Sequence, residues 1–197
     1  MEAGAELIAR ARLICGAEHV LTDGIVLSTY RSDGIRRNGP RPLAAILPRN
    51  ASEVAGVVTA CSQTGVGYVV RGAGTSRSGG ALPVADRVLI VLTRLRRIID
   101  VDGERLSVEA GAPLALLPRP ASGSWLDFTA AIGTVGGHIA ERCGTGNVAA
   151  LDLVRPNGTL VHLDARAPGY DVAGAFCGSR GHAGIAVAFA LEPIRQP

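Results

Sequence analysis

Residues 68–81 read "YVVRGAGTSRSGGA", in which an apolar run leads into four glycines and three hydroxyl residues. The next segment, "ALPVADRVLIVL", has the pattern of a turn followed by a second strand, so no helix is predicted to open at this loop. Successive backbone N–H groups of a glycine-rich loop can form an anion-binding nest, and Thr75, Ser76 and Ser78 add hydroxyl donors. We expect the loop to hold a pyrophosphate better than a single carboxylate. On these residues alone, a merely flexible loop remains the alternative.

Two common phosphate-binding loops do not match this stretch. A Walker loop needs a lysine to meet the phosphates, and the chain contains no lysine. A Rossmann loop needs three glycines in a fixed spacing, but after Gly72 and Gly74 the third position is Arg77. The loop is therefore predicted to bind the pyrophosphate without a Walker or a Rossmann motif.

A second glycine cluster lies at residues 130–146, "AAIGTVGGHIAERCGTG". Gly136 and Gly137 are adjacent, and glycine allows a ligand to approach the bare backbone. Two such loops in one small chain indicate a single extended ligand.

The first half of the chain alternates helices and strands. A helix is expected at residues 3–15, a short buried strand at 43–48, and strands covered on both faces at 66–70 and 88–92. Between the strands, Ser52 is predicted to cap a helix with one apolar face. That face consists of Val54, Val57, Val58 and Cys61.

The second half reads as mostly antiparallel strands. Residues 97–110 have a hairpin pattern with Asp102 and Gly103 as a two-residue turn, residues 148–163 form a second hairpin, and 184–193 a last strand. The predicted fold class is α+β, with a small βαβ lobe over about residues 1–97 and a larger, mainly antiparallel lobe with helices over about 98–197.

Composition favours a soluble cytoplasmic protein of one domain. The chain has 197 residues, of which 47% are hydrophobic and 19% charged, with a net charge of +3. No apolar run reaches the ~18 residues needed to cross a bilayer, and the N-terminal residues lack the pattern of a signal peptide. No nucleic-acid partner is expected, since Arg94, Arg96 and Arg97 have no aromatic residues between them.

The cysteines and histidines predict no metal site. Cys15, Cys61, Cys143 and Cys177 are far apart without a CxxC pair, so reduced thiols are expected. The four histidines are equally dispersed.

Six segments in order carry a resemblance to a known family: "YRSDG", "VRGAGTSRSGGA", "TVGGHIA", "LDLVRPNGTLVHL", "GYD" and "GSRGHAGI". Together they resemble the FAD-binding domain of the vanillyl-alcohol oxidase and p-cresol methylhydroxylase flavoprotein superfamily. Within it they are most similar to FAD-linked 2-hydroxy-acid oxidoreductases, such as glycolate oxidase subunits and D-lactate dehydrogenases.

The resemblance implies non-covalent FAD, with the pyrophosphate on the first loop, the flavin and ribityl chain along the second, and a last segment closing over the cofactor. It assigns no catalytic residue. The implied cofactor-binding residues are Arg71, Gly72, Ala73, Gly74, Thr75, Ser76, Gly79, Gly80, Ala81, Thr134, Gly136, Gly137, Ala140, Gly178, Gly184 and Ile185.

The sequence also departs from the family pattern. Arg180 replaces a glutamate and His182 a threonine in the last segment, and "ERCGTGNV" shortens the stretch after the paired glycines. His138 replaces an asparagine of the family pattern. Its side chain is expected either to face the flavin or to act only as a spacer, and both alternatives are open.

The resemblance implies an FAD-binding domain of an oxidoreductase that transfers a hydride from a 2-hydroxy acid to flavin. Family members continue into a cap domain that carries the substrate pocket, whereas this chain stops after "LEPIRQP". We therefore expect no cap domain and a site completed by a second subunit or a second copy. The alternative is a degenerate or truncated non-catalytic homologue that serves as a subunit or binding module.

Overall fold

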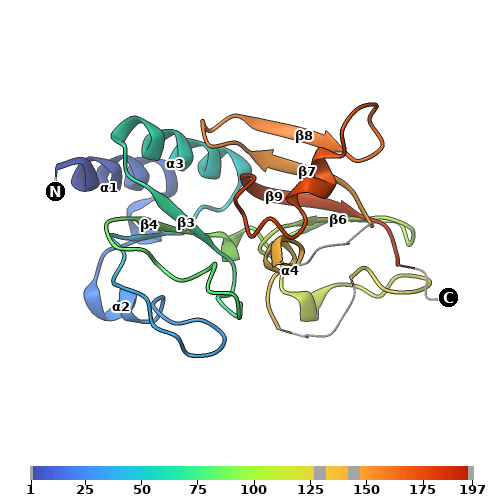
Figure 1. Cartoon of the computed structure of the whole chain (residues 1–197), viewed down its shortest axis with the longest axis horizontal. Coiled ribbons are helices and arrows are strands. Elements are labelled where there is room, and N and C mark those ends of the chain that lie inside the picture. Colours follow the sequence, from blue (N-terminus) through green and yellow to red (C-terminus); the bar gives the residue numbers. More distant parts are fainter. Residues whose placement is uncertain (1, 127–131, 142–146, 195–197) are drawn as a thin grey trace.

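The structure is a computed structural model that describes residues 2–126, 132–141 and 147–194. It contains two sheets, one from each half of the described chain (Figure 1). The first sheet has the strand order β1-β2-β4-β3 and the second the order β5-β6-β9-β7-β8. This mixed architecture confirms the predicted α+β class.

The first sheet is mainly parallel. β2 and β3 both run parallel to the central β4, while β1 is antiparallel to β2. Its strands are β1 (Val20–Leu21), β2 (Ala45–Ile46), β3 (Tyr68–Arg71) and β4 (Val88–Val91).

Helices cover both faces of this sheet. Figure 1 shows α1 (Glu2–Cys15) and α3 (Ala51–Thr64) on one side and α2 (Gly24–Ser28) on the other. The predicted apolar face of α3 is buried, Cys61 included, and packs with α1 in the main core. Leu27 of α2 joins a smaller cluster with Leu89 on the opposite face. Burial on both faces explains why β4 is an unbroken apolar run.

One detail of the first half, the cap of α3, was predicted wrongly. The cap of α3 is Asn50, whose Oδ1 accepts the N–H of Glu53 at 2.9 Å, and Ser52 lies inside the helix. The Glu53 carboxylate accepts the N–H of Arg49 in return, which completes a reciprocal cap. β3 is covered on both faces as predicted, with Tyr68 and Val70 against the main core and Val69 against the smaller cluster, but it is only half-buried because it is the edge strand of the sheet.

The second sheet is antiparallel throughout, as predicted. Its strands are β5 (Ile98–Val101), β6 (Leu106–Glu109), β7 (Val148–Val154), β8 (Leu160–Asp164) and β9 (Ile185–Leu191). The helices of this half are α4 (Val135–Glu141) and α5 (Val172–Phe176). The two sheets use separate stretches of the described sequence.

The turn between β5 and β6 is longer than the two residues predicted. It spans residues 102–105, and Asp102 Oδ1 accepts the N–H groups of Glu104 and Arg105 at 3.0 and 2.7 Å. The side chain of Asp102 thus closes a wider turn than Asp-Gly alone would make.

Candidate cofactor site

A pocket of about 360 Å³ opens where the loop after β3 meets α4 and the segment before β9. Most of the residues predicted to bind the cofactor line it. They are Gly72, Ala73, Gly74, Thr75, Ser76, Gly80, Ala81, Thr134, Gly136, Gly137, Ala140, Gly184 and Ile185. Arg71, Gly79 and Gly178 do not line the pocket. The structure therefore brings together three segments that are far apart in the sequence.

The loop offers a row of unused hydrogen-bond donors. The backbone N–H groups of residues 73–77 donate to no acceptor within the described part of the chain, and all five residues line the pocket. No helix begins between β3 and β4, as the sequence predicted. Consecutive free N–H groups beside a cavity are the donor set that a diphosphate requires.

Glycine at three positions is needed for the close packing around this loop. A Cβ on Gly72 would lie 2.3 Å from Thr134 Oγ1, and a Cβ on Gly136 would lie 2.9 Å from the Cβ of Ala110. Gly74 has φ +72°, and its Cβ would lie 2.0 Å from the Arg71 guanidinium. Gly72 therefore lets the loop approach the residue before α4, Gly136 lets α4 approach Ala110, and Gly74 leaves room for the Arg71 guanidinium.

Arg71 lies behind the loop and not in the pocket. Its Nη1 donates to the carbonyl oxygen of Ala81 at 2.9 Å, and its Nη2 donates to that of Ser32 at 2.9 Å. The guanidinium also lies 5.9 Å from the centre of the Tyr30 ring. Burial lowers the pKa of Arg71 from its usual value, but an arginine remains charged. Its contacts tie the two ends of the loop together.

The other two predicted residues outside the pocket also shape turns. Gly79 has φ +88° and accepts the N–H of Leu82 with its carbonyl oxygen at 3.0 Å. Gly178, with φ +72°, donates its N–H to the carbonyl oxygen of Ile139 at 3.0 Å. This second bond attaches the turn before β9 to α4.

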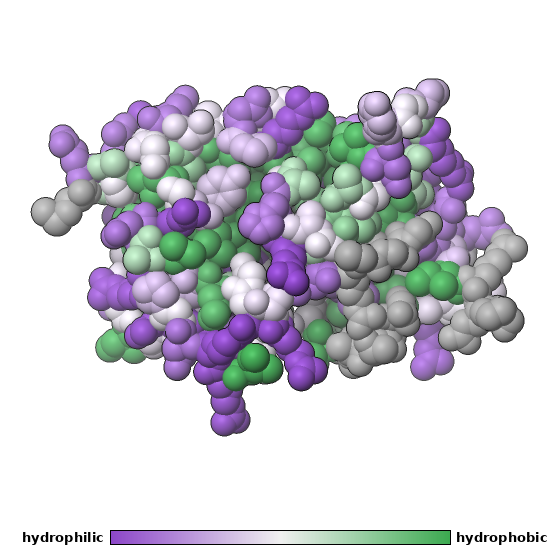
Figure 2. Space-filling model, in the orientation of Figure 1, coloured by the Kyte–Doolittle hydropathy of each residue, from purple (hydrophilic) through white to green (hydrophobic). Residues whose placement is uncertain are grey.

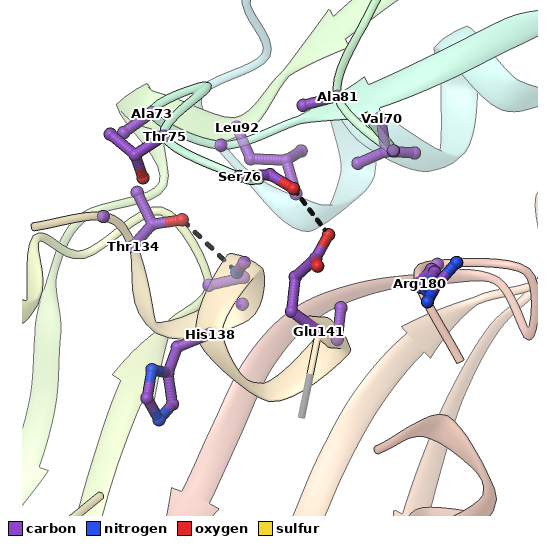
Figure 3. A pocket seen from close by; sticks show the side chains of 18 of the residues that line it. Val70, Ala73, Thr75, Ser76, Ala81, Leu92, Thr134, His138, Glu141 and Arg180 are labelled. Carbon is purple, nitrogen blue, oxygen red and sulfur yellow. Dashed lines mark hydrogen bonds between the residues drawn. The ribbon is translucent and has the colours of Figure 1, made fainter. Parts of the chain in front are cut away.

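α4 contributes a carboxylate that the sequence reasoning missed. Figure 3 shows Glu141 pointing from the end of α4 towards Ser76, and its Oε1 accepts the Ser76 hydroxyl at 2.8 Å. The same oxygen accepts the Ser78 hydroxyl at 2.7 Å. Glu141 follows Thr134 by seven residues, or two helical turns, so helical spacing could have placed both on one face. Thr134 Oγ1 accepts the N–H of Gly137 at 3.3 Å and so supports the first turn of α4.

Arg180 lies in the pocket wall in an uncommon backbone conformation. Its φ is +55°, and its N–H donates to the carbonyl oxygen of Ala140 at 2.7 Å. The side chain takes part in none of the ion pairs among the described residues, and neither does that of Arg77, which also lines the pocket. A non-glycine residue held at positive φ beside a cavity is a common mark of a functional site.

The two histidines that depart from the family pattern are placed differently. His138 lines the pocket, although Figure 3 shows its ring turned away from Ser76. His182 is outside the pocket lining. Cys143 and most of the shortened segment lie outside the described residues.

In the described ranges, no three His, Cys, Asp or Glu residues form a group that could hold a metal ion. No helix among the same residues is long and apolar enough to span a membrane.

Residues 42–164 match the profile of a family described as "FAD binding domain". The chain belongs to this family. FAD is therefore the cofactor of the domain, and its diphosphate suits the free N–H groups of residues 73–77.

Relatives and solved structures agree with this membership. The glycolate oxidase subunit GlcD of Escherichia coli K12 is 29% identical, and the match covers 97% of this chain and 42% of GlcD. A D-2-hydroxyglutarate dehydrogenase of Xanthomonas citri pv. viticola is 33% identical, over 89% of this chain and 42% of that enzyme. The chain thus spans about 42% of the length of these two relatives.

The fold is shared with part of p-cresol methylhydroxylase. The crystal structure of that enzyme with substrate bound superposes with a TM-score of 0.74 at 18% identity, covering 100% of this chain and 44% of the enzyme. The expected fold family is confirmed.

Proposed function

We propose that the pocket binds FAD non-covalently, with the diphosphate against the loop at residues 72–81. The observation that carries this proposal is the row of five backbone N–H groups without acceptors at residues 73–77. Because backbone donors are fixed by the fold, they need no reorganisation to meet an anion. Gly136 and Gly137 would then lie along the rest of the cofactor, and Gly184 and Ile185 would close the pocket.

Competition between ligands tests where the diphosphate binds. ADP has the diphosphate of FAD without the flavin, and riboflavin has the flavin of FAD without the diphosphate. On this proposal, ADP displaces bound FAD in a fluorescence titration, while riboflavin displaces it poorly at the same concentration. Displacement by riboflavin alone would place the main binding energy on the flavin and contradict the role of the loop.

Acid unfolding tests whether the flavin is attached to the chain without a covalent bond. Unfolding the flavin-loaded protein with acid should release all of the yellow colour into the supernatant. Colour that stays with the precipitated chain would show a covalent bond and contradict non-covalent binding.

We further propose that the domain serves an oxidoreductase acting on 2-hydroxy acids, which the names of the glycolate oxidase and D-2-hydroxyglutarate dehydrogenase relatives support. When bound, the flavin would supply the two-electron acceptor for a hydride. The loop, α4 and the segment before β9 would hold the cofactor and exclude water from its diphosphate.

Turnover is proposed to need residues beyond these 197, because the match covers only about 42% of GlcD. Those residues belong either to the same polypeptide or to a partner, and GlcD is itself named a subunit. Apolar surface near the pocket supports a covering partner: Ile132 lines the pocket and is 70% exposed, and Leu116, two residues after the pocket residue Leu114, is 72% exposed. Apolar residues also reach the surface among hydrophilic ones on the face shown in Figure 2.

A second candidate function is a non-catalytic binding module. It is favoured by Arg180, which stands in the pocket wall where the resembling proteins have a glutamate. Assays with glycolate, D-lactate and D-2-hydroxyglutarate and an artificial electron acceptor separate the two functions. Turnover after addition of a partner subunit supports the oxidoreductase, and FAD binding without turnover under any condition supports the module.

A further inference from the structure

Among the described residues that line the pocket, Glu141 is the acidic one. One carboxylate oxygen accepts both the Ser76 and Ser78 hydroxyls, at 2.8 and 2.7 Å. The carboxylate forms no ion pair with Arg77 or Arg180, although all three residues line the same pocket. Within residues 2–126, 132–141 and 147–194, its carboxylate is thus held by two hydroxyl groups and by no ion pair.

The serine hydroxyls are fully committed by this arrangement. Ser76 Oγ accepts the N–H of Ser78 at 3.1 Å, and Ser78 Oγ accepts the N–H of Gly80 at 3.1 Å. The two hydroxyl oxygens also lie 2.9 Å apart and either can donate to the other, so their protons stay within the group of Ser76, Ser78 and Glu141 while their lone pairs accept the loop backbone. The donors left for a ligand on this loop include the N–H groups of residues 73–77 and the Thr75 hydroxyl, whereas the hydroxyls of Ser76 and Ser78 add none.

A fixed carboxylate beside an anion site penalises ligands according to their charge. The Coulomb energy between like charges grows with the charge on the ligand, and a partly buried pocket screens it less than water does. FAD carries about one negative charge on each of its two phosphates. The terminal phosphate of ADP is a monoester that carries about two at neutral pH.

We propose that Glu141 is a specificity-determining residue of the cofactor pocket, which selects the doubly esterified diphosphate of FAD against ligands with a terminal phosphate monoester, such as ADP. This inference rests on the proposed function, because it needs the diphosphate to lie against the loop. It adds an electrostatic filter to a nest that would otherwise accept any diphosphate.

The test removes the negative charge of the Glu141 side chain and keeps its shape. Glu141→Gln retains an oxygen that can accept the serine hydroxyls, and Glu104→Gln removes the same charge from the exposed turn between β5 and β6. Calorimetric titration at low salt gives the dissociation constants of FAD and ADP for both variants and the wild type. We expect Glu141→Gln to bind FAD about fivefold and ADP about 15-fold more tightly, so that the preference for FAD shrinks about threefold. Glu104→Gln should match the wild type.

The outcomes separate this inference from the proposed function. A wild-type chain that binds neither ligand sinks the proposed function itself. If the wild type binds FAD but Glu141→Gln leaves the ratio unchanged, or weakens both ligands together, then Glu141 only supports the loop and the inference is wrong. Should the amide disturb the pocket, Glu141→Ala, checked for helix content by circular dichroism, must show the same narrowing of the ratio, and a constant ratio there also overturns the inference.

Discussion

The guanidinium of Arg71 donates to the carbonyl oxygen of Ala81 at 2.9 Å and thereby joins the start of the glycine-rich loop to its end. Replacing Arg71 with Met would leave this oxygen and that of Ser32 without a donor. Loss of hydrogen bonds to a buried charge costs about 2 kcal/mol or more. We expect a lower melting temperature and about tenfold weaker FAD binding, measured by calorimetric titration.

The control for this substitution is Arg87→Met, at an exposed position directly before β4. It removes the same side chain from a position where the structure gives it no bond to a loop carbonyl. Equal FAD affinities for the two variants would show that Arg71 does not shape the loop.

Gly74→Val should abolish tight FAD binding. Valine at φ +72° is strained, and its Cβ would collide with the Arg71 guanidinium. Gly169→Val imposes a similar strain at φ +123°, but no atom lies within 4 Å of the added Cβ. Fluorescence titration should show at least tenfold weaker binding for Gly74→Val and wild-type binding for Gly169→Val. Unchanged affinity in Gly74→Val would place the diphosphate elsewhere.

Arg180→Glu should weaken FAD binding, because it replaces a cation in the pocket wall with a second carboxylate near Glu141. The effect should be about tenfold at low salt and should shrink at high salt, since the Arg180 side chain is exposed. Arg180→Gln, which removes the cation without adding an anion, should lie between the wild type and Arg180→Glu. The same affinity for all three proteins would show that position 180 is remote from the cofactor.

Asn50→Ala should destabilise the protein by about 1 kcal/mol, since it removes the side-chain cap of α3. Ser52→Ala is the matched control: Ser52 is exposed inside the same helix, where alanine is a good helix former. Urea unfolding followed by circular dichroism measures both free energies. A larger loss for Ser52→Ala would contradict the observed cap.

Two buried thiols should be inert in the folded protein. Burial, the largest cause in each case, raises the pKa of Cys15 and that of Cys61 to about 12, from an ordinary value of 9.0. At pH 8 neither should react with an alkylating reagent until the chain unfolds. Because only the unfolded thiols ionise between pH 9 and 12, these groups lower the free energy of unfolding as pH rises through that window. Rapid labelling of Cys61 in the native protein, seen by peptide mass spectrometry, would contradict its place in the core.

The local patterns in the sequence were sufficient for most of the fold. The apolar face of α3 and the unbroken apolar run of β4 were predictable from neighbouring residues. A helix buried on one face has regularly spaced apolar residues, and a strand buried on both faces has consecutive ones. The cap at Asn50 was missed because Ser52 and Asn50 are both good caps, and the choice depends on which side chain reaches the N–H of Glu53.

The sequence predicted the parts of the candidate site that depend on backbone conformation. It did not predict the side chains whose positions depend on contacts between distant residues. The glycines of the loop carry their own signal, since few other residues allow such close packing. The bonds of Glu141 join residues 63 and 65 positions apart, and the contact of Arg71 with Ser32 spans 39. No local pattern shows these contacts, so Arg71 was expected to face the ligand and Glu141 was not singled out.

The visible absorbance spectrum of the purified chain, recorded after addition of FAD and removal of the unbound excess by gel filtration, tests the central claim most directly. Our account predicts the two visible bands of oxidised flavin in the protein fraction, in near-equimolar amount. A colourless protein fraction, with all of the flavin in the late small-molecule fractions, would contradict the assignment of this pocket as an FAD site.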